Sequence, residues 1–176
     1  MLGRSFEENF PKQVCEIGEK AFEIDHLTER EGRVQDISMY VRKGEIVGLA
    51  GLVGGGKTEL CKTIFGVYKK SDGIIRLNGK ELNIKTPSDA VKNRIALVPE
   101  ERRKEGVLVA ETVTFNTTAA SLDDYCTFSF VNDRKAAKKA EEYVKSLSIK
   151  TPSIKQKVAY PVSYTHLRAH ETDQYL

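Results

Sequence analysis

Residues 51–58 read G-L-V-G-G-G-K-T, a complete G-x-x-x-x-G-K-[ST] pattern, and constrain the fold more than any other feature of this chain. The pattern follows directly on the apolar run 46–50 and precedes a segment with apolar residues at helical spacing that ends at Gly66. An apolar run of this kind is typical of a strand buried on both faces of a parallel sheet. The sequence therefore predicts a strand, a glycine-rich loop and a helix in immediate succession.

The predicted loop has the chemistry of a phosphate-binding site. Its glycines allow several backbone N–H groups to turn toward one point, and the following helix adds its unpaired N-terminal donors. Lys57 supplies a mobile positive charge, and the Thr58 hydroxyl can join the shell of a Mg²⁺ ion. The residues expected to bind a nucleotide are Gly51, Leu52, Val53, Gly54, Gly55, Gly56, Lys57, Thr58 and Glu59.

Composition narrows the class of protein. With 176 residues and 40% hydrophobic content, the chain can form one domain with a real core. A net charge of +3 gives no reason to expect a nucleic-acid partner, and no apolar run has the length of a membrane span. The three cysteines form no C-x-x-C pair, which suits a reducing cytosol.

Local patterns outside the loop predict further elements. Asn78-Gly79 between two apolar-containing runs indicates a tight hairpin, because both positions tolerate positive φ. Pro87 is expected in the first turn of a short helix. The other predicted elements are strands at 21–27 and 37–41, a second buried strand at 95–98 and an amphipathic helix at 133–147.

Several stretches together carry a family resemblance: 44–54, 56–60, 75–80, 86–90 and 96–103. On these residues the chain resembles the ATP-binding subunit of an ABC importer of the carbohydrate branch (ribose, galactose, xylose). The resemblance implies an incomplete α/β P-loop NTPase fold, with an antiparallel β subdomain and part of a helical subdomain. It implies ATP and Mg as cofactors. It further implies inner-membrane permease subunits, a second ATPase domain and, indirectly, a sugar-binding protein as partners, at the cytoplasmic face of the cell membrane.

Two positions depart from the usual family pattern. Glu100 stands where most ABC ATPases carry a glutamine that touches Mg²⁺, so Thr58 and Glu100 are the expected metal ligands. The aromatic residue that usually stacks on adenine is not evident in residues 28–34. Arg30 or Arg33 could stack there through the planar guanidinium, or both could be solvated turn residues, which the sequence favours.

The resemblance also divides the chain. Residues 1–20 are interpreted as an interdomain linker or arm that follows a first ATPase domain, and 21–160 as the N-terminal portion of the second. Residues 161–176 look like one reading frame of a sequencing-library adapter and are interpreted as a non-native tail. The family's signature motif, catalytic glutamate and switch histidine do not occur in the sequence. We therefore expect no catalytic residue in this chain, weak nucleotide binding and essentially no ATPase activity for the isolated polypeptide.

Two alternatives stay open at this stage. Another P-loop phosphotransferase, such as a small-molecule kinase, would need a cluster of lid arginines, for which Arg102-Arg103-Lys104 is the candidate. The other alternative is an inactive nucleotide-binding fragment.

Overall fold

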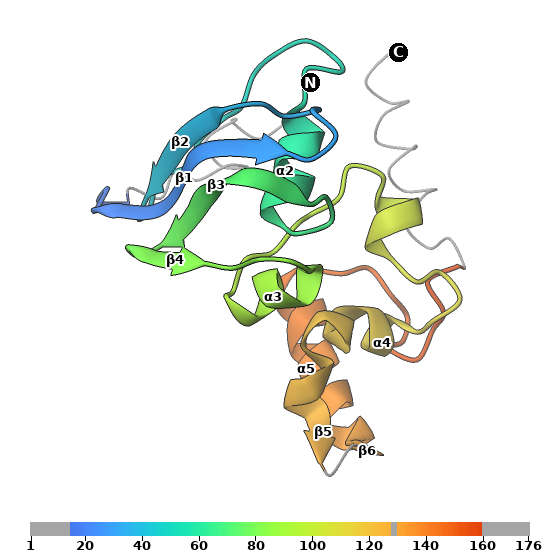
Figure 1. Cartoon of the computed structure of the whole chain (residues 1–176). Coiled ribbons are helices and arrows are strands. Elements are labelled where there is room, and N and C mark those ends of the chain that lie inside the picture. Colours follow the sequence, from blue (N-terminus) through green and yellow to red (C-terminus); the bar gives the residue numbers. More distant parts are fainter. Residues whose placement is uncertain (1–14, 128–129, 160–176) are drawn as a thin grey trace, which may run out of the picture. The chain divides into compact units, whose positions relative to one another are not determined.

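A computed structural model of the chain describes residues 15–127 and 130–159. The chain divides into two compact units, Met1–Leu97 and Val98–Leu176. Each is described below by itself (Figure 1). Most of the predicted linker, 1–20, and all of the predicted tail, 161–176, lie outside the described residues, so the interpretation of these segments stays a prediction.

The first unit is built around a four-stranded antiparallel sheet with strand order β2-β1-β3-β4. The strands are β1 (Lys20–Glu29), β2 (Ile37–Arg42), β3 (Lys70–Leu77) and β4 (Lys80–Leu82). β3 and β4 form the predicted hairpin, in which Asn78 and Gly79 have φ of 50° and 77°. Positive φ at both central residues matches the right-handed twist of the two strands, which explains why Asn-Gly stands there.

Two helices complete this unit. They are α2 (Lys57–Ile64) and α3 (Pro87–Lys92). The predicted end of the first helix at Gly66 is confirmed, because Phe65 caps α2 and Gly66 follows with a φ of 81°. α3 begins with a complete capping box between Thr86 and Asp89, with Pro87 in its first turn as predicted.

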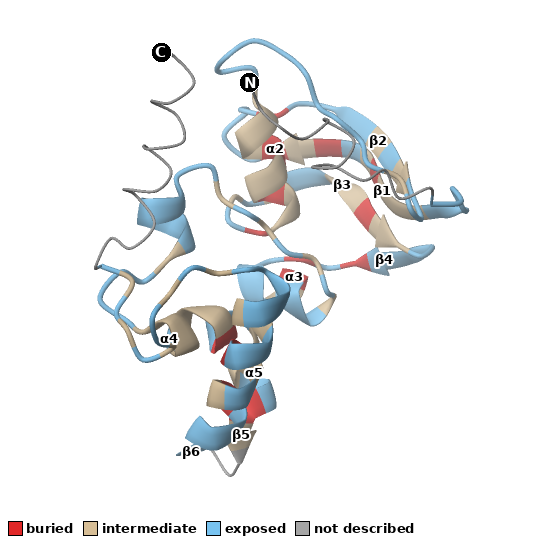
Figure 2. Ribbon diagram, turned by 180° about the vertical axis from the view of Figure 1, so that it is seen from behind, coloured by how far each residue is buried: buried red, intermediate tan, exposed pale blue. Residues whose placement is uncertain are grey.

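The core of the first unit lies where one face of the sheet meets the two helices, as the burial colouring shows (Figure 2). Its buried residues are Ile24, Leu27, Val34, Leu60, Ile75, Leu82, Ile84 and Ala90. Leu60 comes from the helix that follows the glycine-rich loop, while Ile24 and Ile75 face each other on β1 and β3. The loop is therefore anchored at its C-terminal end by apolar packing on the sheet.

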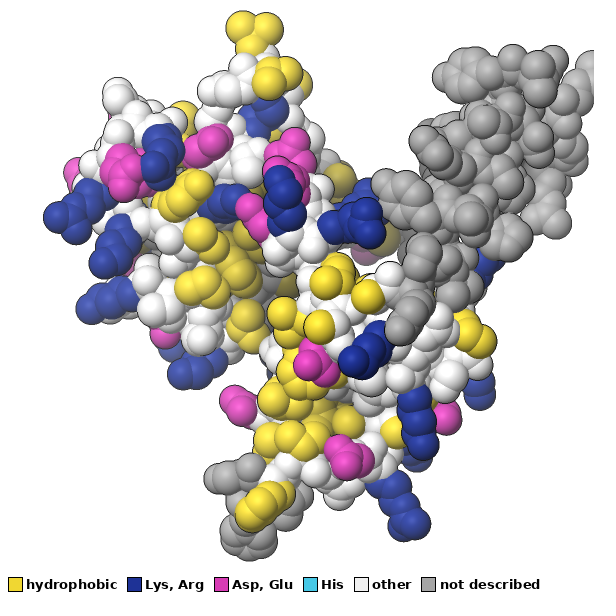
Figure 3. Space-filling view, turned by 90° about the vertical axis from the view of Figure 1, so that its right-hand side faces the viewer, with side chains coloured by type: hydrophobic (Ala, Val, Ile, Leu, Met, Phe, Trp, Pro, Cys, Tyr) yellow, Lys and Arg dark blue, Asp and Glu magenta, His cyan; other side chains and the backbone are white. Residues whose placement is uncertain are grey.

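Two strand predictions are wrong. Neither 46–50 nor 95–98 forms a strand, and Ile46 is 98% exposed while Val98 is 85% exposed. A strand requires hydrogen-bond partners on its neighbours, and no segment among the described residues pairs with either run. Apolar side chains of both runs therefore reach solvent, and hydrophobic patches are visible on the surface (Figure 3).

The second unit is mainly helical. Its elements are a π-helical turn (Arg102–Gly106), α4 (Val113–Thr118), a 3-10 helix (Ala119–Tyr125), the short hairpin β5 (Cys126–Thr127) and β6 (Phe130–Val131), and α5 (Asp133–Ser146). α5 confirms the predicted amphipathic helix and packs on α4, and its Ala136 and Ala140 are buried. The predicted apolar stripe stops short of its end, because Leu147 caps the helix and is 69% exposed.

Candidate functional site

The glycine-rich loop turns sharply before α2. The Gly55 N–H donates to the Leu52 carbonyl at 3.0 Å, and Gly54 and Gly56 have φ of 79° and 80°. A Cβ on Gly55 would lie 3.0 Å from the Leu52 oxygen, and one on Gly56 would lie 3.2 Å from the Arg33 oxygen. A side chain at either position would therefore crowd the backbone, which explains the glycines at the end of the motif.

The start of α2 offers donors rather than a side-chain cap. Gly56 is the N-cap residue and makes no side-chain hydrogen bond, while its carbonyl accepts the Leu60 N–H at 2.8 Å. The first-turn N–H groups of such a helix point outward along its axis, at the positive end of the helix dipole. The backbone geometry thus fits the predicted anion cradle at the start of α2.

Lys57 turns back into the loop. Its Nζ donates to the carbonyls of Gly51 and Leu52, at 2.9 and 2.7 Å. Both acceptors are neutral, so the ammonium is hydrogen-bonded without a counter-charge from these two partners. An anion bound in the loop would therefore lie near the Lys57 ammonium group, which the loop already holds by these two hydrogen bonds.

A cavity of about 340 Å³ opens between this loop and the turn that joins β1 to β2. Its lining residues are Arg33, Val34, Gln35, Ile37, Ser38, Met39, Leu49, Ala50, Gly55, Gly56, Lys57 and Leu60. The loop provides backbone donors and the charge of Lys57 at one end of the cavity. At the other end, the β1–β2 turn and β2 provide three apolar side chains and three polar or charged ones, which are Val34, Ile37, Met39, Arg33, Gln35 and Ser38. A volume of this size falls in the range of small-molecule sites.

The turn itself shows what the two arginines do. Arg33 is held by the carboxylates of Glu29 and Glu31 and lies over the Tyr68 ring, with 4.6 Å from its guanidinium carbon to the ring centre. Arg30 is exposed, and its N–H donates to the Lys69 carbonyl at 2.9 Å. The exposed Arg30 fits the interpretation of a solvated turn residue. Arg33 instead contacts Glu29, Glu31 and Tyr68 of the protein itself. The sequence had offered only stacking on adenine or a solvated turn residue, and neither alternative included these contacts.

The two expected metal ligands fall in different units, Thr58 on α2 and Glu100 just before the π-helical turn. Their pairing around Mg²⁺, and the role of Glu59 beside them, stay predictions. Within residues 15–127 and 130–159, no three His, Cys, Asp or Glu side chains come together in a way that could hold a metal ion.

An acidic cluster around His26 was not foreseen from the sequence. His26 is exposed and lies in a bulge of β1 with a φ of 53°, and its Nδ1 lies 2.5 Å from the Asp36 carboxylate. The hydrogen bond to Asp36, and then the charges of Asp36 and Asp25, raise the pKa of His26 above its ordinary value. The spacing of residues 26 and 36 does not predict this contact, because the contact arises at the bulge in β1.

Comparison with known proteins decides the family. The sequence profile of the ABC transporter family matches residues 34–167. The chain belongs to the ABC transporter family. This match covers the loop, every residue that lines the cavity except Arg33, and most of the second unit. The incomplete P-loop ATPase fold expected from the resemblance is therefore confirmed.

Similar proteins are ATP-binding subunits of sugar importers. The ribose import ATP-binding protein RbsA of Clostridium tetani is 43% identical over 89% of this chain and 31% of its own length. The xylose import protein XylG of Thermoanaerobacter pseudethanolicus is 41% identical, over 90% and 33%. The galactose/methyl galactoside import protein MglA of Fusobacterium nucleatum is also 41% identical, over 90% and 32%. The chain therefore spans about a third of the length of these relatives.

Among solved structures, a bacterial Atm1-family ABC exporter with ATP bound matches with a TM-score of 0.49 and 17% identity. It covers 85% of this chain and 25% of the exporter chain. Within the described part of the chain, no helix has the length and apolar character needed to cross a membrane.

Proposed function

We propose that this chain is the nucleotide-binding portion of an ATP-binding subunit that energises sugar import. The observation that carries the proposal is the loop of residues 51–58, whose positive-φ glycines and uncapped helix start open into a cavity of about 340 Å³. The relatives named for ribose, xylose and galactose import support the substrate class. They give no support to the small-molecule kinase alternative.

In this proposal the phosphates of ATP bind the backbone of residues 51–59. The loop suits phosphates because its glycines keep the backbone free of side chains, and added Cβ atoms at Gly55 and Gly56 would crowd it. Lys57 moves from its two carbonyl acceptors to the terminal phosphates. Thr58 and Glu100 would hold Mg²⁺, which would neutralise part of the negative charge of the phosphates.

The nucleoside half of ATP rests at the other end of the cavity, against the β1–β2 turn. Val34, Ile37 and Met39 provide apolar surface there, next to the polar Gln35 and Ser38. Together with Arg33, these residues give the wall both apolar surface and polar groups, which suits a purine base and its ribose.

The remaining parts of the proposal concern partners and turnover. The segments 101–107 and 112–121 meet inner-membrane permease subunits, a second ATPase domain closes over the nucleotide, and a sugar-binding protein delivers the cargo. The assembled protein works peripherally at the cytoplasmic face of the membrane. The 176-residue chain alone binds ATP weakly without hydrolysing it, because the family's water-positioning and charge-stabilising groups do not occur in its sequence.

A titration of the full chain with a fluorescent ATP analogue and Mg²⁺ tests the proposal. We expect saturable binding that Lys57→Ala weakens by about 10- to 100-fold, the cost of losing a charge-assisted hydrogen bond. Lys69→Ala is the matched control, because it removes the same charge from an exposed position just after α2. Absence of a saturable signal would refute nucleotide binding. Steady phosphate release that Lys57→Ala abolishes would refute the absence of turnover.

A further inference from the structure

The turn that walls the cavity is organised by one buried carboxylate. The Glu29 side chain is only 2% exposed, and its Oε2 accepts the backbone N–H groups of Glu31 and Arg33, at 3.0 and 3.2 Å. Burying a charge is unfavourable unless it is paired and hydrogen-bonded. The carboxylate therefore holds the backbone of the turn in place through these two hydrogen bonds.

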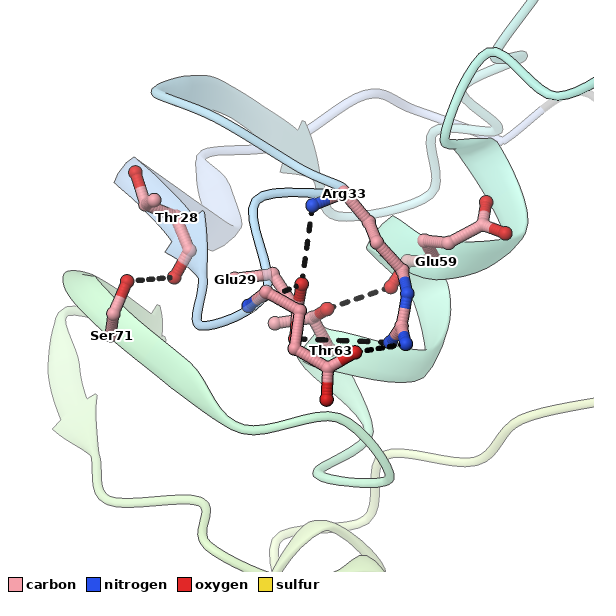
Figure 4. A network of polar contacts seen from close by, with 7 residues as sticks. Thr28, Glu29, Arg33, Glu59, Thr63 and Ser71 are labelled. Atoms are coloured by element: carbon pink, nitrogen blue, oxygen red, sulfur yellow. Dashed lines mark hydrogen bonds and ion pairs between the residues drawn. The ribbon is translucent and has the colours of Figure 1, made fainter.

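The other oxygen of the same carboxylate faces an arginine. The Arg33 Nη1 lies 3.9 Å from Glu29 Oε1, and the guanidinium also pairs with Glu31 and covers the Tyr68 ring. Figure 4 shows the Arg33 side chain extending toward the Glu29 carboxylate. Because Tyr68 follows α2 in the chain, Arg33 ties the turn to the segment beyond that helix.

Backbone contacts carry this arrangement to the cavity. The Glu29 N–H donates to the Val34 carbonyl at 2.9 Å, which closes the turn. Val34 is 4% exposed and belongs to the core, while Arg33, Val34 and Gln35 all line the cavity. A shift of the turn would therefore move one wall of the cavity.

We propose that Glu29 and Arg33 are positioning residues for nucleotide binding. Their ion pair, supported by Tyr68, fixes the wall against which the nucleoside half of the nucleotide rests. The phosphate half is held independently by the loop of residues 51–58. This inference rests on the proposed function, and it assigns the placement of the cavity wall to the pair of the buried Glu29 and the partly exposed Arg33.

The test compares two ligands on the full chain, Mg·ATP and Mg·tripolyphosphate, the second of which lacks the nucleoside. Glu29→Gln keeps an oxygen for the two N–H groups but replaces the charge that faces Arg33. Arg33→Met keeps an apolar stem over Tyr68 and leaves the Glu29 carboxylate with its two N–H donors. Glu23→Gln is the control, because it removes one carboxylate from the exposed pair with Lys20 on the same strand.

We expect both variants to bind Mg·ATP about tenfold more weakly, as small misplacements of a positioning group do, with tripolyphosphate affinity within about twofold of the original. The control should change neither affinity. Equal weakening for both ligands, with hydrogen-exchange protection of β1 and β3 intact, would overturn the assignment of the turn to the nucleoside. Unchanged affinity for both would overturn it as well.

Two further outcomes are distinguishable. If the original chain binds neither ligand, the proposed function itself fails and this inference falls with it. If the sheet loses hydrogen-exchange protection in Glu29→Gln, that variant no longer tests the proposal, and Arg33→Met provides the test. The two hydrogen bonds that shape the turn do not involve the Arg33 side chain, so this variant leaves them in place.

Discussion

Replacement of Gly73 by alanine should open the sheet of the first unit at one defined point. Gly73 lies on β3 opposite the bulge of β1, between the register pairs Asp25↔Ile74 and Thr28↔Asp72. A Cβ there would lie 2.5 Å from the Leu27 Cα and 2.6 Å from the His26 oxygen. Both atoms belong to the backbone, so rotation of a side chain cannot relieve the contact.

The expected loss of stability has two parts. Gly73 has a φ of 93°, and an L-residue in left-handed backbone costs about 1–2 kcal/mol. Separating β1 from β3 to admit the methyl group costs about 1–3 kcal/mol more, which is the usual cost of adding a methyl group at a well-packed position. The free energy of unfolding should fall by about 2–5 kcal/mol in total.

Gly79→Ala separates these two parts. Gly79 has a φ of 77°, but a Cβ there would have no atom within 4 Å, so only the backbone cost of about 1–2 kcal/mol applies. The measurement is hydrogen exchange of the Ile75 amide in each variant, because this amide reports on the sheet of one unit alone. If Gly73→Ala exchanges no faster than Gly79→Ala, the close approach of β1 and β3 at the bulge is not real.

Three further predictions concern other contacts. The raised pKa of His26 means that its protonated form stabilises the fold fully below its ordinary pKa of 6.5 and that this contribution is lost as pH rises through the folded value. The stability advantage of the original chain over His26→Asn, which keeps a residue suited to positive φ, should therefore shrink as the pH rises above about 6.5 in urea titrations followed by circular dichroism. An advantage that grows with pH would contradict this. Thr86→Ala removes the N-cap acceptor of the Asp89 N–H and should cost α3 about 1 kcal/mol, seen as faster exchange of the Ala90 amide with β1 unaffected. Ala140→Leu should destabilise the packing of α5 on α4 by about 1–3 kcal/mol, because Ala140 is fully buried, and an unchanged urea midpoint would refute that packing.

Much of the first unit follows from short-range chemistry. Asn78-Gly79 specifies its hairpin, and Thr86-Pro87 specifies a helix start, because the decisive hydrogen bonds join residues a few positions apart. The loop of residues 51–58 is also largely local, since its positive-φ glycines and the start of the following helix shape most of it. The elements that carry the candidate phosphate site were therefore accessible from the sequence.

The misses share a different physical origin. Residues 46–50 have the composition of a buried strand, yet composition says which residues can be buried and not which segment covers them. Glu29 looks like a polar residue at the end of a strand, and only the folded turn brings its carboxylate to two N–H groups and Arg33. The wall of the cavity depends on such contacts, so the sequence could predict the glycine-rich loop of the candidate site better than the wall formed by the β1–β2 turn.

The exposed run 46–50 has a practical consequence for handling the protein. Ile46, Val47 and Leu49 present apolar side chains to solvent on a stretch whose backbone pairs with no other described segment. Such a stretch can recruit a like segment from another molecule and start aggregation. Self-association should therefore increase with protein concentration, and light scattering across a dilution series is the first measurement to make before any affinity is interpreted.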